Sequence, residues 1–427
     1  YSNTGGNAID VDLNGGQDTL NVVGNALSQT FDVNADTGVV TIDDLNDTTL
    51  EGTVNFVNAE SLCVYGLEGA DTFLLTTGAV PIFIDGGDPI GTSAGDRIGP
   101  INAGGELITL ETGPEPDEGG IIVGDDERVS FDHIEELGPI VNAKAVLIVG
   151  TTGDDDITVI ARDNSTHPDT DTLGNSDPGV RDFTVSVNDG PEILFIDPNN
   201  PENGQGELFI DALAGDDDIV IRTPAPNNAD WDMQVYVAGG APSDGAPNEG
   251  DRLVVETPSF DQIDSVNVSD DVIYTPSGSD TGTVHLDEDG SGAVTPGDTV
   301  IHIGPFQVIC MMDVVYVSDP GGVELLEYDG EAGNDVLTVR GDGASDDTND
   351  RFVHTPGDEV DAGTIAVHNG LESLLAINYQ NLGASATVTA DGLGGSDTLV
   401  TQGTASNDVI DVDFTALNAA DIDLQSL

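Results

Sequence analysis

The stretch that decides the fold is Ala390-Asp-Gly-Leu-Gly-Gly-Ser-Asp397-Thr-Leu-Val400, a glycine- and aspartate-rich turn that runs into a short apolar strand. Its pattern is Gly-x-x-Gly-x-Asp followed by alternating apolar residues. Glycine allows positive φ angles and lets main-chain carbonyls converge, and aspartate supplies hard oxygen ligands beside them. Because Ca²⁺ prefers ligands of this kind, the pattern predicts both a strand start and a calcium-binding turn.

The pattern recurs along the chain, in places without its first glycine. The aspartates that end its copies are Asp18, Asp71, Asp155, Asp217, Asp335 and Asp397. They form three pairs and predict three related β-modules, over about residues 1–148, 149–325 and 326–427. The first two modules share a later Gly-Gly…Gly-Asp-Arg element, at 86–97 and 239–252. The third stops before that element, so we expect a segment of a longer array or a subunit that its neighbours complete.

Composition favours an all-β, repetitive chain. Glycine is abundant (54 residues), aromatic residues are scarce (5%), and no long segment shows a helical period. Asp and Glu number 80 against 9 Lys and Arg, for a net charge of −71. Divalent cations, a saline habitat or cationic partners would neutralise this charge. Nucleic acid and anionic membranes are excluded as direct partners, and no apolar run is long enough to span a bilayer.

The strand spacing predicts a parallel β-helix or similar solenoid. Strands are expected at 60–65, 72–75, 81–84 and 97–98, and like faces return from Leu62 to Ile82 and from Thr72 to Arg97. A return after 20 to 25 residues is typical of one solenoid coil with Gly/Asp turns at its corners. Tandem immunoglobulin-like sandwiches are the alternative.

The Gly-x-x-Gly-x-Asp turns resemble the haemolysin-type (RTX) calcium-binding nonapeptide, Gly-Gly-x-Gly-x-Asp-x-apolar-x. The resemblance implies Ca²⁺ shared between successive coils, with the six turn aspartates as ligands. RTX repeats are tandem, whereas these turns are far apart. The nearest tandem pair is 394–400 followed by 403–410, which adds Asp408. The competing interpretation is a tight turn in which Asp caps the backbone.

Residues 287–298 (Asp-Glu-Asp-Gly-Ser-Gly-Ala-Val-Thr-Pro-Gly-Asp) resemble an EF-hand loop, in the dockerin variant that ends in Asp. Such a loop wraps alternating oxygen donors around one ion and turns sharply at a glycine. The ligands implied are Asp287, Asp289, Ser291, Ala293, Thr295 and Asp298. A strand, not a helix, is expected to follow, and a solvated acidic hairpin turn is the alternative.

The other polar residues predict structural roles. Five arginines (Arg97, Arg162, Arg222, Arg252 and Arg340) recur beside strands and are expected to pair with local carboxylates. Cys63 and Cys310 lie in apolar runs and are expected to be buried thiols, with one long-range disulfide as the alternative. No nucleophile motif, metal-binding histidine pair or phosphate loop is present, and Lys144 is the only lysine.

We therefore expect a non-enzymatic, extracellular repeat protein of a bacterial or archaeal cell surface, stabilised by Ca²⁺. It would be a subunit of a surface layer, filament or matrix that assembles with copies of itself through strand edges. An adhesin or stalk that binds surface polysaccharide is the alternative, with residues 163–182 and 342–350 as recognition loops. A polysaccharide lyase is a remote third.

Overall fold

The computed structural model describes residues 8–426, apart from 45–49, 89–94, 163–180, 202–203, 226–230, 243–249, 258–269, 288–289, 296, 311–312, 319, 332, 342–348, 395, 404–407 and 417–418. The described residues form strands and turns and no helix, as expected. The chain forms two compact units. The first comprises 1–214 and 307–316, and the second comprises 215–306 and 317–427. This division does not test the three sequence modules, which stay a prediction.

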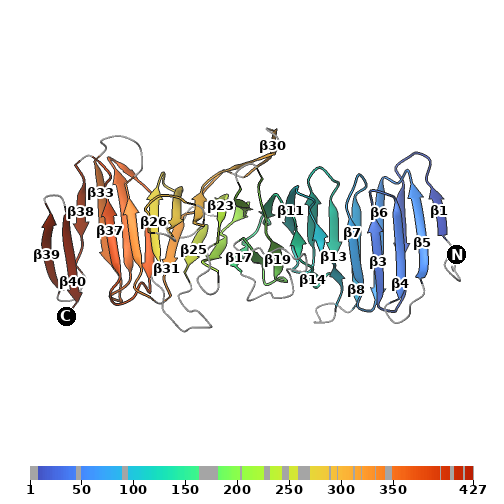
Figure 1. Ribbon diagram of the computed structural model, residues 1–427, viewed down its shortest axis with the longest axis horizontal. Helices are drawn as coiled ribbons and strands as arrows, with labels where there is room; N and C mark the ends of the chain where they lie inside the picture. The colour runs from blue at the N-terminus through green and yellow to red at the C-terminus, as the bar shows by residue number, and fades with distance from the viewer. Residues whose placement is uncertain are drawn as a thin grey trace. The chain divides into compact units, whose positions relative to one another are not determined.

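The first unit contains strands of three sheets (Figure 1). One has the order β1-β5-β4-β3-β7-β9-β14: β1 (Ala8–Asp12), β3 (Gln29–Asn34), β4 (Val39–Asp44), β5 (Leu50–Val57), β7 (Thr72–Thr76), β9 (Arg97–Ile98) and β14 (Glu136–Leu137). The next has the order β2-β6-β8-β13-β12-β11-β16-β20: β2 (Thr19–Val23), β6 (Ser61–Glu68), β8 (Ile82–Asp88), β11 (Leu107–Thr112), β12 (Gly119–Val123), β13 (Val129–Asp132), β16 (Ala145–Val149) and β20 (Gly206–Asp211). The last has the order β10-β15-β19-β18-β17: β10 (Ile101–Asn102), β15 (Ile140–Val141), β17 (Asp156–Ala161), β18 (Phe183–Val187) and β19 (Ile193–Ile196).

The second unit contains two series of paired strands. One has the order β22-β25-β31-β36-β34-β33-β38: β22 (Asp218–Arg222), β25 (Arg252–Glu256), β31 (Leu325–Asp329), β33 (Asp350–Pro356), β34 (Gly363–Asn369), β36 (Ile377–Gln380) and β38 (Thr398–Thr401). The other has the order β23-β28-β27-β26-β32-β37: β23 (Met233–Ala238), β26 (Asp271–Pro276), β27 (Gly282–Leu286), β28 (Thr299–Ile303), β32 (Val336–Arg340) and β37 (Thr387–Asp391). Shorter or separately paired strands occur in both units: β21 (Ala214–Gly215), β24 (Ala241–Pro242), β29 (Gln307–Cys310), β30 (Asp313–Val317), β35 (Glu372–Ser373), β39 (Asp408–Ala416) and β40 (Ala419–Ser426).

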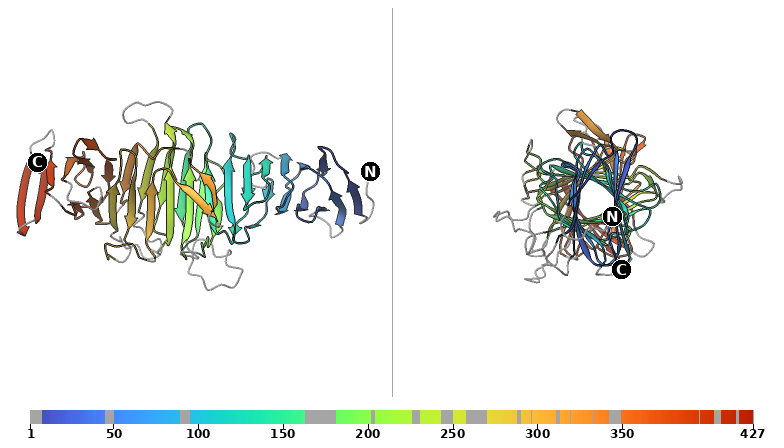
Figure 2. Two further views of the ribbon diagram at one scale, coloured as in Figure 1. Left: turned by 90° about the horizontal axis from the view of Figure 1, so that it is seen from above. Right: turned by 90° about the vertical axis from the view of Figure 1, so that its right-hand side faces the viewer.

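The parallel pairing confirms a solenoid-like arrangement. β6 pairs with β8 in the register Leu62↔Ile82, and β7 pairs with β9 in the register Thr72↔Arg97. These are the coil lengths that the sequence predicts. The chain alternates between sheets, and each return adds a strand beside an earlier one, as the successive coils of the first unit show in Figure 2.

Five antiparallel detours interrupt the parallel coils, and the sequence did not predict them. At each detour the chain runs forward, back and forward within one sheet. The five sets are β3-β4-β5, β11-β12-β13, β17-β18-β19, β26-β27-β28 and β33-β34-β36. In each set at least one outer strand still pairs in parallel with a coil of its own unit, as β3 does with β7 and β19 does with β15.

Alternating side chains build the core between the sheets. In β6 the inward residues Leu62 and Val64 are buried, and they align with Ile82 and Ile84 of β8. Phe31 stacks on Phe73, with ring centroids 5.0 Å apart. Inward-facing residues of successive coils therefore lie beside one another, because side chains alternate between the two faces of a strand.

Cys63 faces outward on β6 and differs from expectation. It is a free thiol and is half-buried, because outward positions of this sheet are only partly covered. The side chain of Cys310 lies outside the described residues.

Candidate metal sites

An acidic residue stands immediately before strands of the first unit, and these acids form a column. The N–H of Gln29 donates to Asp71 Oδ1 (2.7 Å). The N–H of Asp71 donates to Asp96 Oδ1 (2.6 Å), and the N–H of Asp96 donates to Glu135 Oε2 (2.6 Å). Each carboxylate thus caps the first N–H of the preceding coil, where the parallel ladder begins.

The second unit repeats this acid column. The N–H of Asp217 donates to Asp251 Oδ1 (3.0 Å), and the N–H of Asp251 donates to Glu324 Oε2 (2.9 Å). Both columns therefore have the order Asp, Asp, Glu on three successive coils. The sequence predicted one member of each column, Asp71 and Asp217, and the structure adds the other two members of each.

The second carboxylate oxygen explains the first glycine of the motif. A Cβ on Gly66 would lie 2.4 Å from Asp71 Oδ2 and 2.5 Å from the carbonyl oxygen of Gly86 on the next coil. The first glycine of the Gly-Gly…Gly-Asp-Arg element is placed in the same way, because a Cβ on Gly239 would lie 2.5 Å from Asp251 Oδ2 and 2.4 Å from the carbonyl oxygen of Gly322. Only glycine leaves room for these two oxygens.

Within the described residues, the Oδ2 atoms of Asp71, Asp96 and Asp251 are buried and accept no hydrogen bond. Each lies, together with a main-chain carbonyl oxygen, close to the Cβ position of one glycine (Gly66, Gly86 or Gly239), so two acceptors crowd the same corner. Burial of such atoms is costly unless a proton or a cation compensates. The columns are therefore candidate cation sites.

The acidity of these groups agrees with their burial. Burial is the main reason that the pKa of Asp71 is raised to about 7; the hydrogen bond from Gln29 opposes this rise, and the Asp96 carboxylate contributes to it. Burial also raises the pKa values of Asp96 and Asp251 to about 6, with Glu135 and Glu324 adding to the effect. The charged form of these carboxylates is thus under-compensated in the protein alone.

Asp18, Asp335 and Asp397 also meet an acidic partner from another coil. The N–H of Asp18 donates to Glu60 (2.8 Å), and that of Asp350 donates to Asp397 (3.0 Å). The N–H of Asp270 donates to Asp335 (3.0 Å), and burial raises the pKa of Asp335 to about 7.

Asp155 differs from the other turn aspartates. It accepts a hydrogen bond within its own turn from Thr151 N–H (2.7 Å) and another from the side chain of Asn188 (2.6 Å), which follows β18. Its surroundings fit the capping interpretation better than a metal site. Asp397 is exposed, and Asp408 begins β39 with its side chain outside the described part.

The sequence alone did not identify five of the partner residues as candidate ligands: Glu60, Asp96, Asp251, Asp270 and Asp350. A signal existed for two of them, because Asp96 and Asp251 occupy the repeated Gly-Asp-Arg element. Their pairing with Asp71 and Asp217 follows from coil lengths, which the variable loops obscure.

The EF-hand-like segment forms the connection between the antiparallel strands β27 and β28. Asp287 Oδ1 accepts the N–H of Ser291 (3.0 Å), and Oδ2 accepts the N–H of Gly292 (2.6 Å). Ser291 Oγ donates to the carbonyl oxygen of Ala293 (2.9 Å). Asp289 lies outside the described residues, so the full ligand set stays a prediction.

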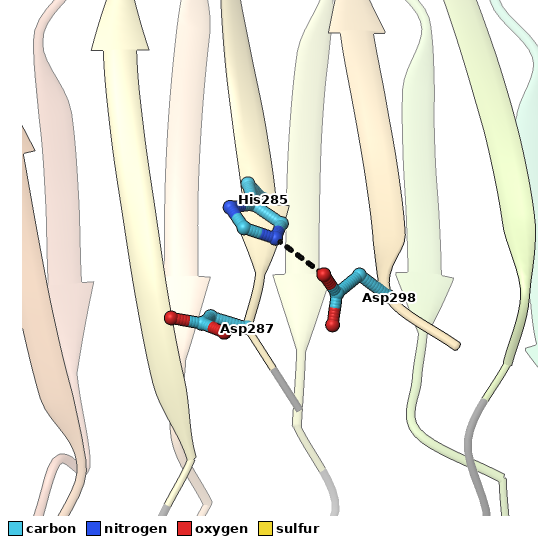
Figure 3. A group of neighbouring side chains, drawn as sticks. All are labelled: His285, Asp287 and Asp298. Atoms are coloured by element: carbon cyan, nitrogen blue, oxygen red, sulfur yellow. Dashed lines mark hydrogen bonds and ion pairs between the residues drawn. The ribbon is translucent and has the colours of Figure 1, made fainter. Parts of the chain in front are cut away.

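The loop ends bring together a group that the sequence did not predict. His285, Asp287 and Asp298 are buried, and one ligand atom from each lies within 4.8 Å of the others (Figure 3). His285 Nε2 lies 3.1 Å from Asp298 Oδ2. The signal for His285 was its position two residues before Asp287, since alternate strand residues share a face.

The arginines pair with carboxylates as predicted. Arg222 contacts Glu256 (3.0 Å) and Glu331, and Arg252 contacts Glu327 (2.8 Å). Arg97, Arg162 and Arg340 likewise lie beside Glu136, Glu192 and Asp391. No ion pair of a lysine or arginine with Asp71, Asp96 or Asp251 occurs among the described residues.

Comparison with known proteins assigns no family. The chain matches no protein-family model, and no curated protein is found to be similar. The described part of the chain also contains no helix that is long and apolar enough to cross a membrane. The predicted recognition loops fall mostly in residues 163–180 and 342–348, outside the described part.

Proposed function

We propose that this chain is a non-enzymatic, extracellular structural protein whose β-solenoid is stabilised by Ca²⁺ at its coil corners. The observation that carries the proposal is the repeated acid column. Asp71–Asp96–Glu135 and Asp217–Asp251–Glu324 stack carboxylates on adjacent coils. Among the residues that the structure describes, Asp71, Asp96 and Asp251 form no ion pair with a lysine or arginine. A divalent cation would neutralise the stacked charge and join carboxylate and carbonyl oxygens, which are the ligands that Ca²⁺ takes.

The mechanism is linkage between binding and folding. An ion that binds only the folded corners adds about 2.7 kcal/mol of stability per site at a hundredfold excess over its Kd. The net charge of −71 opposes the compact state, so bound cations also reduce self-repulsion. Folding would then be favoured outside the cell, where calcium is abundant.

The edges of the described sheets support assembly with copies of the same chain. β2 pairs only with β6, and β37 pairs only with β32, within the described residues. Exposed apolar side chains also occur near such edges, including Val23 (53% exposed) on β2 and Leu399 (44% exposed) on β38. Strand addition between copies, in a surface layer, filament or matrix, would pair the free edges and cover these residues.

Thermal unfolding of the full chain tests the calcium proposal. Measurements would compare Ca²⁺, Mg²⁺, Zn²⁺ and EGTA, each at low and at multimolar NaCl. We expect Ca²⁺ at low salt to raise Tm steeply, and NaCl, Mg²⁺ or Zn²⁺ not to replace it. Full recovery of Tm by NaCl alone would show that the acids are a salt adaptation.

Sedimentation velocity tests assembly separately. We expect the chain to form oligomers in Ca²⁺ and to dissociate in EGTA. A chain that stays monomeric across the concentration range with its fold intact contradicts assembly, while leaving calcium stabilisation untouched.

A further inference from the structure

A buried group of mixed ligand chemistry lies where the β27–β28 loop begins and ends. His285 is on β27, Asp287 follows that strand, and Asp298 precedes β28. The three residues are 5%, 6% and 1% exposed. The antiparallel register Leu286↔Thr299 brings the two loop ends side by side.

The surrounding hydrogen bonds hold both carboxylates in place. Asp287 is fixed by two loop N–H groups, and Asp298 Oδ2 accepts the N–H (2.6 Å) and the hydroxyl (3.0 Å) of Thr295. Arg340 Nη2 donates to the Gly292 carbonyl oxygen (3.2 Å) and ties the loop to β32. Such support orients ligands before an ion arrives.

The ligand chemistry selects the metal. Ca²⁺ is bound by oxygen atoms, whereas an imidazole with two carboxylates suits Zn²⁺ and neighbouring transition-metal ions. Two ligands of a tetrahedral zinc ion lie about 3.3 Å apart, given bond lengths of about 2.0–2.1 Å. The His285–Asp298 separation of 3.1 Å already fits, and Asp287 offers a carboxylate oxygen within 4.8 Å of the other two ligand atoms.

We propose that His285, Asp287 and Asp298 form a binding site for a divalent transition-metal ion of the zinc class. A simple ion pair between His285 and Asp298 does not explain the second buried carboxylate. Two carboxylates and one imidazole leave net negative charge, which a divalent ion neutralises. The ion would link β27 to β28 across the loop, and three protein ligands leave a position for water.

Cobalt titration of the full chain in saturating Ca²⁺ tests this site apart from the calcium columns. We expect one equivalent of Co²⁺ to give visible absorption bands of a nitrogen-containing site, which Zn²⁺ abolishes and excess Ca²⁺ does not. Displacement of Co²⁺ by Ca²⁺ would instead identify an oxygen-only calcium loop and overturn the proposal.

Three variants locate the site. His285→Gln should weaken Co²⁺ binding by more than about 100-fold, whereas His302→Gln, on the adjacent β28, should bind as the unchanged protein does. Asp287→Asn keeps the His285–Asp298 pair but should also weaken binding strongly. Unchanged binding in Asp287→Asn or His285→Gln, with circular dichroism showing the fold intact, contradicts the site. If His285→Gln does not fold, Asp287→Asn alone decides.

Discussion

Asp96 and its counterpart Asp251 each use the two oxygens of one carboxylate differently. Oδ1 caps the N–H of the preceding coil, and the buried Oδ2 shares the space beside one glycine with a carbonyl oxygen. The first contact is a structural role that the neutral amide of asparagine can also perform. The second requires a cation or a proton. Substitutions at these positions therefore separate capping from metal binding.

Asp96→Asn and Asp96→Ala should have opposite effects in EGTA at neutral pH. Asparagine keeps the cap and turns an N–H₂ toward the nearby carbonyl, so the metal-free protein should become more stable. Alanine leaves the buried Asp71 N–H without an acceptor and should cost about 1–3 kcal/mol. Denaturant unfolding measures both changes.

The calcium response completes the comparison, since asparagine lacks the charge that binds Ca²⁺. The rise in Tm on adding Ca²⁺ should be smaller in Asp96→Asn than in the unchanged chain. An undiminished rise would mean that Asp96 only caps the backbone.

The two glycines of the turn at 150–155 should differ sharply in tolerance. A Cβ on Gly150 would lie 2.7 Å from both Asp155 Oδ2 and the carbonyl oxygen of Ala212, whereas a Cβ on Gly153 meets nothing nearer than 3.7 Å. Gly150→Ala should therefore destabilise the protein by about 1–3 kcal/mol, as overpacking does. Gly153→Ala is the matched control and should be nearly neutral; equal losses of stability in the two variants would refute this account.

At the scale of elements, the parallel register allows a direct chemical test. Asn21 on β2 lies opposite Cys63 on β6, and both face outward. Cα atoms of neighbouring strands lie within the 4.4–6.8 Å that a disulfide usually spans. Asn21→Cys, in a Cys310→Ser background, should therefore cross-link to Cys63 on mild oxidation, as thiol counting and mass spectrometry would show.

Val23→Cys is the control for that cross-link. It lies on the same strand and face but opposite Tyr65, two residues farther along. Efficient oxidation of both variants would mean that the strands slide, and oxidation of Val23→Cys alone would mean that the register is wrong.

The coil register was predictable because glycine turns and alternating apolar residues mark the start and inner face of each strand. Leu62↔Ile82 and Thr72↔Arg97 follow from this pattern. The antiparallel detours were not predictable, because alternation is the same in parallel and antiparallel strands. Turn signals such as Gly38, at φ +68° between β3 and β4, are compatible with a hairpin or a coil corner.

The candidate sites were only partly predictable for the same reason. Local motifs identified Asp71, Asp217 and Asp287, which stand at recognisable turns. Glu60, Asp270 and His285 lack such a motif, and coil packing or strand pairing places them beside the predicted residues. The calcium-binding motifs used for the prediction contain only oxygen ligands, so they do not identify a histidine such as His285.

For the molecule as a whole, the buried acids and the net negative charge both destabilise the metal-free fold at neutral pH. The folded-state pKa values of about 6 to 7 at Asp71, Asp96, Asp251, Asp270 and Asp335 exceed that of an unfolded aspartate, near 4. Folding of the metal-free chain therefore takes up protons. The stability from these groups is fully present below pH about 4 and is lost as pH rises through about 6 to 7.

The metal-free protein in EGTA should accordingly have a higher Tm near pH 5 than at pH 7.5. Calcium requires the deprotonated carboxylates, so the increase in Tm that Ca²⁺ causes should grow over the same interval. Thermal unfolding across this pH range, at fixed ionic strength with and without Ca²⁺, measures both trends. A metal-free Tm that rises with pH would show that the acids are compensated within the chain itself. A calcium increment independent of pH would show that Ca²⁺ binds at exposed acids outside the columns.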